Sequence, residues 1–526
     1  MGHSSVFYTS HPHHVVDVKK LASAYFLVTF FVQYVEYVHL VIPVWDMGHA
    51  IQYIHAIPET NPLYTFFYQG VLYLFAPLYF SDNVVSLIFV QSLVMTVVIP
   101  VLHRITLMVT NDVKKADFVA LLYVFYPQNW GIFFFPFHFQ TLFLPFFFLM
   151  YYYVIKDKPL HAGVFSVLAS LVRYPYVYLV VFYALTERRY RNRAWRAVLL
   201  TSVAIAIVST VLSLHNPQAV PPVDKEAHLD AYSSIPLFDR VMTYLTVLYP
   251  ASFMVFSPYA VNLIPSFVYF ALVNYQSVLY PNYFRFQYAP LFEYAVLLSV
   301  IDALRRFELR RFMYVNAMLS FVLFSVMSPL SINTVNWYAV FTTPTYVFYL
   351  DKLLPYLPQD ATYMVQNNLP ELFPNADKCV APLTLGMMNV TMDNYSVAHN
   401  NYKIWIFTEW VNESVDYVVV DPLGEFFNMA LNQTNFFYTH GYGIYAEYGY
   451  IFVLKYNYSG NPVVFKPFEF VLTRDVGVYL APGVYNVSAP LYLNDTLVDG
   501  TFTLDRFGYY VLNLTVTPTY MMYIDT

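Results

Sequence analysis

The sequence predicts a polytopic α-helical membrane protein with an extracytoplasmic C-terminal region built of an α/β domain and a small β-sandwich. Three observations predict this fold class. The 526-residue chain is 58% hydrophobic and only 11% charged, whereas soluble domains are about 25% charged. Apolar runs long enough to cross a bilayer recur over residues 21–350. Strand-like alternation and N-glycosylation sequons fill most of the remainder.

The composition also limits the partners and the chemistry. The net charge is −6 and the basic residues stand in short clusters, so we expect no nucleic-acid partner. The only cysteine, Cys379, excludes an intrachain disulfide. The sequence contains no P-loop, Rossmann glycine pattern, nucleophile elbow or HExxH motif. It therefore gives no support for ATP-driven or soluble-cofactor chemistry.

Short basic clusters set the expected orientation in the cell membrane. Lys19 and Lys20 precede the first apolar run, and basic residues favour the cytoplasmic side. We therefore expect residues 1–20 to be a cytoplasmic tail and about eleven helices to span the membrane, which places the C-terminus outside the cell. The other clusters expected on the cytoplasmic side are 103–104, 114–115, 156–158, 187–196 and 305–311.

The segment 159–186 is too short for two full spans of about 20 residues each, although basic clusters flank it on both sides. It predicts two short helices that meet at Arg173–Pro175, because Pro175 disfavours helix at Tyr174. We interpret 63–80, which contains Pro77, as re-entrant or interfacial. The full-length spans are expected at 21–44, 84–102, 116–135, 139–155, 197–214, 238–256, 260–277, 287–303 and 312–328.

The exported region divides into an α/β domain at 351–460 and a β-sandwich at 461–526. The stretch 415–422 has the pattern of a buried strand, and 442–456 predicts a hairpin that turns near 447–449. Glycosylation acceptors belong to extracytoplasmic surfaces, so sequons test the orientation independently of charge. We expect N-glycans at eight sequons, none of which precedes this region: Asn389, Asn394, Asn412, Asn432, Asn457, Asn486, Asn494 and Asn513.

The stretch "VWDMGHAIQYIH" at 44–55 directly follows the first span, on the expected outer side. A carboxylate there, Asp46, could act as a general base or hold a divalent cation. His49 and His55 would flank it if the segment is helical, and His49 and Gln52 are expected to bind substrate. The competing interpretation is that these polar residues simply end a helix at the interface.

Other polar residues are expected on the same face of the membrane. His138 and Gln140 lie at the turn between two predicted spans, and Arg285 lies in another outer loop. Arg173 lies at the junction of two predicted half-helices, where an arginine is costly in a bilayer unless it is paired or lines a water-filled cavity. Its guanidinium suits a phosphate ligand. The alternative for Arg173 is contact with lipid head groups.

The order of these motifs resembles the prokaryotic membrane-protein family called domain of unknown function 2079. Asp46, Gly48 and Gln52 match a D-x-G-x-x-x-Q pattern, and 136–139 resembles a D-F-H-P motif that keeps the histidine and lacks the acid. Arg173–Tyr174 stands where the family pattern has a basic-acidic pair. The resemblance implies a GT-C-like architecture, the architecture of glycosyltransferases that take sugars from polyprenyl-phosphate carriers.

The resemblance implies transfer of a sugar from a polyprenyl-phosphate donor to an acceptor at the outer face. Asp46 and His138 would be the catalytic residues, and Asp46 the ligand if a divalent cation is bound. His49, Gln52, Gln140, Arg173 and Arg285 would bind substrate. The alternative is a non-catalytic envelope protein whose glycosylated ectodomain binds other envelope proteins. A transporter is a third interpretation, for which Glu36 and Glu293 are the acids within predicted spans.

Overall fold

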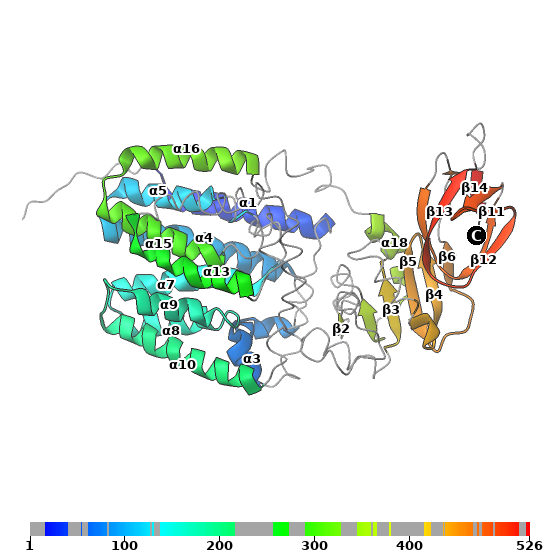
Figure 1. Cartoon of the computed structure of the whole chain (residues 1–526), viewed down its shortest axis with the longest axis horizontal. Coiled ribbons are helices and arrows are strands. Elements are labelled where there is room, and N and C mark those ends of the chain that lie inside the picture. The colour runs from blue at the N-terminus through cyan, green and yellow to red at the C-terminus, as the bar shows by residue number, and fades with distance from the viewer. Residues whose placement is uncertain are drawn as a thin grey trace, which may run out of the picture. The chain divides into compact units, whose positions relative to one another are not determined.

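The structure is a computed structural model, and it divides into a helical unit and a strand-rich unit (Figure 1). The helical unit comprises Met1–Glu36, Ile54–His215 and Val223–Trp337, and the strand-rich unit comprises the remainder. The residues described are 16–39, 54, 62–80, 84–126, 129–130, 137–215, 256–272, 290–327, 345–358, 361–365, 378–379, 415–421, 435, 437–466, 471–472, 476–487, 490–514 and 522–525.

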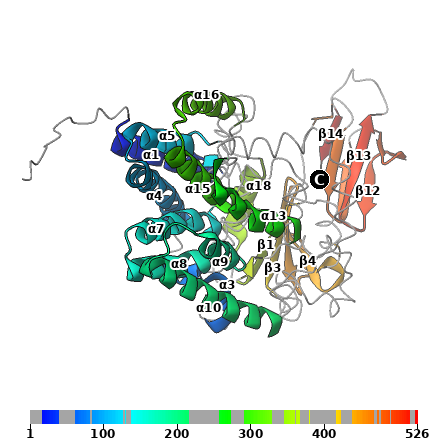
Figure 2. The same cartoon turned by 60° about the vertical axis from the view of Figure 1, so that its left-hand side comes forward.

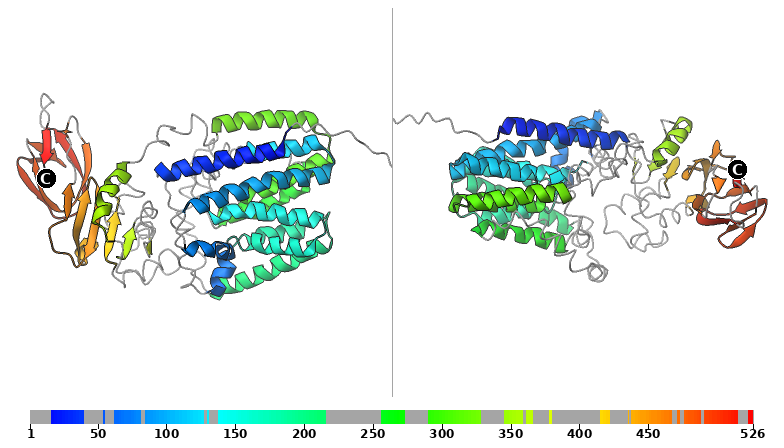
Figure 3. Two further views of the ribbon diagram at one scale, coloured as in Figure 1. Left: turned by 180° about the vertical axis from the view of Figure 1, so that it is seen from behind. Right: turned by 90° about the horizontal axis from the view of Figure 1, so that it is seen from above.

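The long helices of the first unit run side by side, as two opposite views show (Figures 1 and 3). The described helices of this unit are α1 (Val18–His39), α3 (Pro62–Gln69), η1 (Gly70–Phe80), α4 (Val84–Thr110), α5 (Val113–Val124), η2 (Phe139–Leu142), α7 (Phe143–Ile155), α8 (Pro159–Ser170), α9 (Val177–Thr186), α10 (Arg193–His215), η5 (Pro258–Asn262), α13 (Leu263–Leu272), α15 (Pro290–Arg306) and α16 (Arg310–Met327).

Within the described residues, two helices are long and apolar enough to cross a membrane, Val85–Thr110 and Arg193–His215. Helices α7, α8 and α9 are apolar but shorter. Large apolar side chains are exposed along α10 and α16, among them Leu200, Leu214, Tyr314 and Met318. Exposed apolar surface of this kind suits contact with lipid rather than water.

Two expectations for this unit have clear outcomes. The paired short helices are confirmed, because α8 ends at Ser170 and α9 begins at Val177. The expected span at 116–135 is wrong at both ends. Its helix starts at Val113, where the Asp112 side chain caps the backbone N–H groups of Lys114 and Lys115, and it ends at Val124. The expected span at 238–256 lies almost wholly outside the described residues.

The strand-rich unit begins with α18 (Thr345–Leu353) and η7 (Leu354–Tyr356), followed by a mixed sheet. The predicted hairpin is confirmed and turns at Gly449 and Tyr450, where Gly449 has a φ of +61°. The predicted buried strand is also confirmed as β3, whose four residues are all buried. The sheet order is β2 (Lys378–Cys379), β1 (Tyr363–Val365), β3 (Tyr417–Val420), β5 (Ile451–Tyr456), β4 (Tyr442–Tyr448) and β6 (Val464–Lys466).

Two four-stranded sheets follow, and their buried residues form one cluster that includes Leu480, Tyr485, Leu491 and Leu512. Members of both sheets contribute to it, as expected for two sheets that pack face to face (Figure 2). One sheet contains β11 (Thr496–Val498), β10 (Leu491–Leu493), β13 (Gly508–Leu514) and β8 (Val476–Leu480); the other contains β12 (Thr501–Leu504), β9 (Gly483–Val487), β14 (Met522–Asp525) and β7 (Val471–Leu472).

Aromatic side chains join the mixed sheet to these two sheets. Phe452 of β5 contacts Phe507, with ring centroids 4.7 Å apart, and Phe465 of β6 contacts Tyr485 at 6.2 Å. Glu447 of β4 is paired in register with both Phe452 and Phe465. Paired residues point to the same face of a sheet, so the Glu447 carboxyl lies among these rings, and it is fully buried.

Candidate functional site

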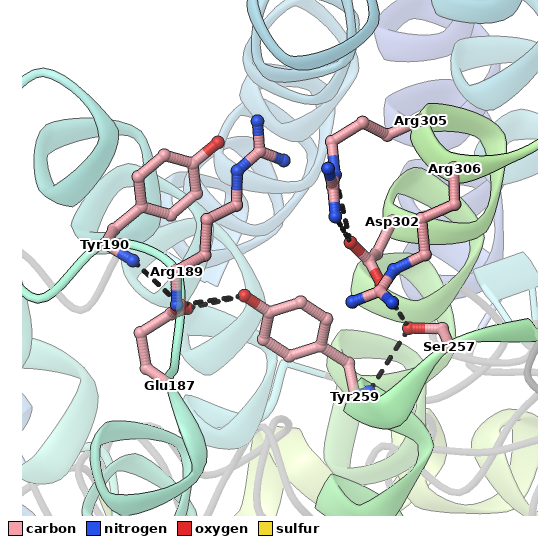
Figure 4. A network of polar contacts seen from close by, with 8 residues as sticks. All are labelled: Glu187, Arg189, Tyr190, Ser257, Tyr259, Asp302, Arg305 and Arg306. Carbon is pink, nitrogen blue, oxygen red and sulfur yellow. Dashed lines mark hydrogen bonds and ion pairs between the residues drawn. The ribbon is translucent and has the colours of Figure 1, made fainter.

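One end of the helical unit contains two buried carboxylates, Glu187 and Asp302 (Figure 4). We call it the basic end, because residues of the predicted basic clusters contact one another there. Glu187, at the end of α9, is fully buried. Its carboxylate accepts hydrogen bonds from the backbone N–H groups of Arg189 and Tyr190, at 2.6 and 3.1 Å. The Tyr259 hydroxyl donates to the same carboxylate, 2.9 and 2.8 Å from its two oxygens.

Asp302 of α15 completes this network. Its carboxylate pairs with Arg305 at 2.9 Å and Arg306 at 2.7 Å, and it accepts a hydrogen bond from Ser257 at 3.0 Å. The Ser257 hydroxyl oxygen in turn accepts the backbone N–H of Tyr259 at 3.2 Å. The network therefore links α9, η5 and α15 at one level of the bundle (Figure 4).

The remaining basic clusters reach the same end. Lys115 donates to the carbonyl of Leu304 at 2.8 Å and pairs with Glu308 at 3.0 Å. His103 contacts Asp117 of α5 at 3.1 Å. The Asn192 side chain donates to the carbonyl of Val154, at the end of α7. The predicted clusters thus share one end of the unit, which is the geometric requirement for a single cytoplasmic face.

His138 lies at the opposite end of the bundle, as the first residue before η2. It is extended, with φ −129° and ψ 131°, and only 6% of its surface is exposed. Its backbone N–H donates to Oε1 of Gln91 in α4 at 3.1 Å, and its carbonyl accepts the Thr141 hydroxyl at 2.7 Å. Gln140, within η2, is also buried.

A line of amides continues from His138 across α4 into α1. Gln91 donates to Oε1 of Gln33 at 3.0 Å, and Gln33 donates to the Ser92 hydroxyl at 2.8 Å. Gln33, Gln91 and Ser92 are all buried. We call His138, Thr141, Gln91, Ser92 and Gln33 the polar belt. Buried polar groups that bridge helices are costly to place in a membrane bundle and are commonly functional.

Aromatic rings flank the backbone of His138. Phe137 and Phe139 stand on either side of it in the chain, with ring centroids 5.0 Å apart. Phe75 of η1 contacts them at 5.2 and 5.3 Å. These rings exclude water from the turn, which strengthens the electrostatic interactions of polar groups there.

Arg173 lies in the turn between α8 and α9 and is half-buried. α8 has 12 residues, a length of about 18 Å at 1.5 Å per residue. A bilayer core is about 30 Å thick, so α8 alone is too short to span it. An arginine inside a bilayer is costly unless it is paired or lines a water-filled cavity.

The turns that carry Arg173 and His138 are joined by η1. Val71 donates a backbone hydrogen bond to Leu171 at 3.2 Å, and Tyr174 donates to the carbonyl of Tyr68 at 2.6 Å. Four residues beyond Val71, Phe75 contacts the rings beside His138. A 3₁₀ segment of that length spans about 8 Å. The segment predicted to be re-entrant or interfacial therefore packs against both turns.

Several predicted site residues cannot be placed with these two turns. Asp46, His49, Gln52 and Arg285 lie outside the described residues, and so do the sequons at Asn389, Asn394, Asn412 and Asn432. Across the described ranges, no three His, Cys, Asp or Glu side chains gather into a metal site. Among the described sequons, Asn457, Asn486 and Asn494 are exposed and Asn513 is half-buried.

The sequence analysis missed the amides of the polar belt. Gln91 and Ser92 stand inside an otherwise apolar run, and Thr29 and Gln33 are four residues apart on the first helix. That spacing places Thr29 and Gln33 on one helix face, a signal that could have found them. The sequence does not show that this face meets Gln91.

A protein-family model matches this chain. A search of curated proteins finds none that matches the chain. The family described as "Predicted membrane protein (DUF2079)" matches residues 67–385, which include η1, both turns and most of the polar belt. The matched region covers more than half of the 526 residues. The chain belongs to this family of predicted membrane proteins, DUF2079.

Proposed function

We propose that the protein is a GT-C-like transferase that moves a sugar from a polyprenyl-phosphate-linked donor to an acceptor at the outer membrane face. The observation that carries this proposal is the buried polar belt at the end of the bundle opposite the basic end. Basic residues favour the cytoplasm, so the polar belt faces the outer leaflet. A lipid-linked sugar arrives there after it has crossed the membrane.

A cation is expected beside the phosphate of the donor, because this phosphate is the leaving group. As the bond between the sugar C1 and the phosphate oxygen breaks, negative charge develops on the phosphate, and a preorganised cation stabilises it. Arg173 is the proposed partner because a guanidinium matches phosphate geometry and because α8, which precedes its turn, is too short to span a bilayer. Arg285 is a second proposed contact.

The acceptor hydroxyl loses its proton as its oxygen bonds to C1. Asp46 is the proposed base for that proton, or else the ligand of a divalent cation that faces the phosphate. His138, Gln140, His49 and Gln52 are proposed to hydrogen-bond the sugar or the acceptor. The lipid phosphate is the leaving group and remains in the membrane.

The test is mass spectrometry of surface glycans and lipid-linked sugars in cells that carry variants at equal expression. Asp46→Asn and His138→Gln should remove one sugar from the glycans and accumulate its lipid-linked donor, as expected when a chemical step is blocked. His215→Gln is the matched control, since His215 is exposed at the end of α10. Unchanged glycans with normal amounts of both variants would overturn transfer and favour an envelope interaction protein.

A further inference from the structure

Glu293 is a fully buried carboxyl that the proposed transfer does not use. It lies in the first turn of α15, where every residue from Pro290 to Leu304 is buried. Neither carboxyl oxygen has a hydrogen-bond partner among the residues that the structure describes. Glu187 is equally buried, but Arg189, Tyr190 and Tyr259 supply it with donors. The two acids therefore occupy opposite kinds of environment.

The surroundings of Glu293 contain an amide and two phenols. Asn129 is close enough to the carboxyl to interact with it, but it makes no hydrogen bond of ordinary geometry with either oxygen. Tyr25 of α1 and Tyr123 of α5 are the titratable groups on which its charge acts. The other helices that pack against α15 are α4, α7, α13 and η5. Among their described residues, no lysine, arginine or histidine pairs with Glu293.

The amide of Asn129 is held by one hydrogen bond. Its Nδ2 donates to the carbonyl of Tyr123 at 2.8 Å, which fixes the amide and leaves Oδ1 as the other polar atom. Oδ1 is buried and has no donor in the described part of the chain. An ionised carboxylate is only an acceptor, so it cannot satisfy Oδ1, whereas a protonated carboxyl carries one O–H donor.

We propose that Glu293 is a proton-binding site within the helical unit, where the protonated carboxyl donates its O–H to Oδ1 of Asn129. An ionised carboxylate without donors in a dry interior is strongly destabilising, and protonation removes that charge. Release of the proton to water requires the bundle to open at Asn129, because both groups are enclosed. The site therefore links proton release to an opening movement of α15, independently of sugar transfer.

The test compares Glu293→Gln with Glu187→Gln in the purified full-length protein. Glutamine is close in shape to a protonated glutamate. At neutral pH, Glu293→Gln should keep the melting temperature of the native protein, and its infrared spectrum should lose a protonated-carboxyl C=O band. Glu187→Gln should lower the melting temperature by several degrees and retain that band. A loss of stability in Glu293→Gln equal to that in Glu187→Gln would overturn the proposal.

A second variant keeps the test decisive if Glu293→Gln fails to fold. Asn129→Leu removes the acceptor, so the C=O band of Glu293 should shift to higher frequency. Glu447, the other buried acid that has no hydrogen-bond partner within the described part of the chain, supplies its own band. A protonated-carboxyl signal that Glu447→Gln removes entirely would overturn the proposal. So would a native melting temperature that rises with sodium or potassium concentration, which would identify the ligand as a metal cation.

Discussion

At the scale of single residues, burial acts on two acids in different ways. Glu187 accepts hydrogen bonds from two backbone N–H groups and the Tyr259 hydroxyl. Glu447 is just as buried, but its neighbours in register are Phe452 and Phe465, and neither oxygen has a partner among the described residues. Desolvation therefore raises the pKa of Glu447 well above its usual 4.5.

This raised pKa predicts that the strand-rich unit is more stable in acid than at neutral pH. Below about pH 4.5 Glu447 is protonated in both the folded and the unfolded chain. Above it, the unfolded chain loses the proton while the folded chain keeps it, so the free energy of unfolding falls as pH rises, until the folded pKa is passed. The measurement is the unfolding midpoint of this unit against pH, followed by hydrogen exchange of β4 and β5.

Glu447→Gln is the control for this pH dependence. It keeps the shape of the protonated acid and cannot ionise, so the decrease over this pH range should become shallower. An equally steep decrease in Glu447→Gln would assign the pH dependence to other groups. Tyr485, whose pKa is raised by burial and by the Glu447 charge, is the titratable neighbour on β9.

At the scale of elements, the contact between η1 and the turn after α8 decides how Arg173 and His138 are held. Gly70 begins η1, and a Cβ at this position would lie 3.1 Å from Cδ1 and 3.2 Å from Cβ of Leu171. Leu171 is buried and its Cβ is fixed by the backbone. The glycine therefore permits the close approach of these two segments.

Gly70→Ala is expected to destabilise the helical unit by about 1–3 kcal/mol through overpacking against Leu171. Gly163→Ala is the matched control, because a Cβ there would meet Ala197 at an ordinary 3.8 Å. Alanine in the interior of α8 should be neutral, or stabilising by up to about 1 kcal/mol. Melting temperatures in one detergent give the comparison. Equal changes in the two variants would show that the Gly70 contact has no special role.

The element scale also shows what periodicity can predict. Two features of the sequence predicted the break between α8 and α9. The segment 159–186 lies between two basic clusters but is too short for two full spans, and Pro175 disfavours helix at the residue before it. The early end of α5 was not predictable in this way. The apolar run continues past Val124, and hydropathy alone does not record where a helix stops.

At the scale of the whole molecule, the sequence predicted a helical region followed by strand-rich sheets, because composition and period differ so sharply between them. It also predicted that His138, Gln140 and Arg173 stand at turns of the bundle. It did not predict the polar belt, since the pairing of Gln91 with Gln33 depends on which faces of α1 and α4 meet. The predicted roles of Asp46 and Arg285 stay predictions.

The most direct measurement of the central claim is binding of a polyprenyl monophosphate to the purified protein, with Arg173→Gln and Arg189→Gln as a matched pair. Arg189 is exposed at the basic end. Loss of one charge-assisted hydrogen bond of about 1.5–3 kcal/mol should weaken binding about tenfold or more in Arg173→Gln. Arg189→Gln should bind like the native protein. Equal affinity of all three proteins, or no binding by the native protein, would contradict a lipid-phosphate site at this turn.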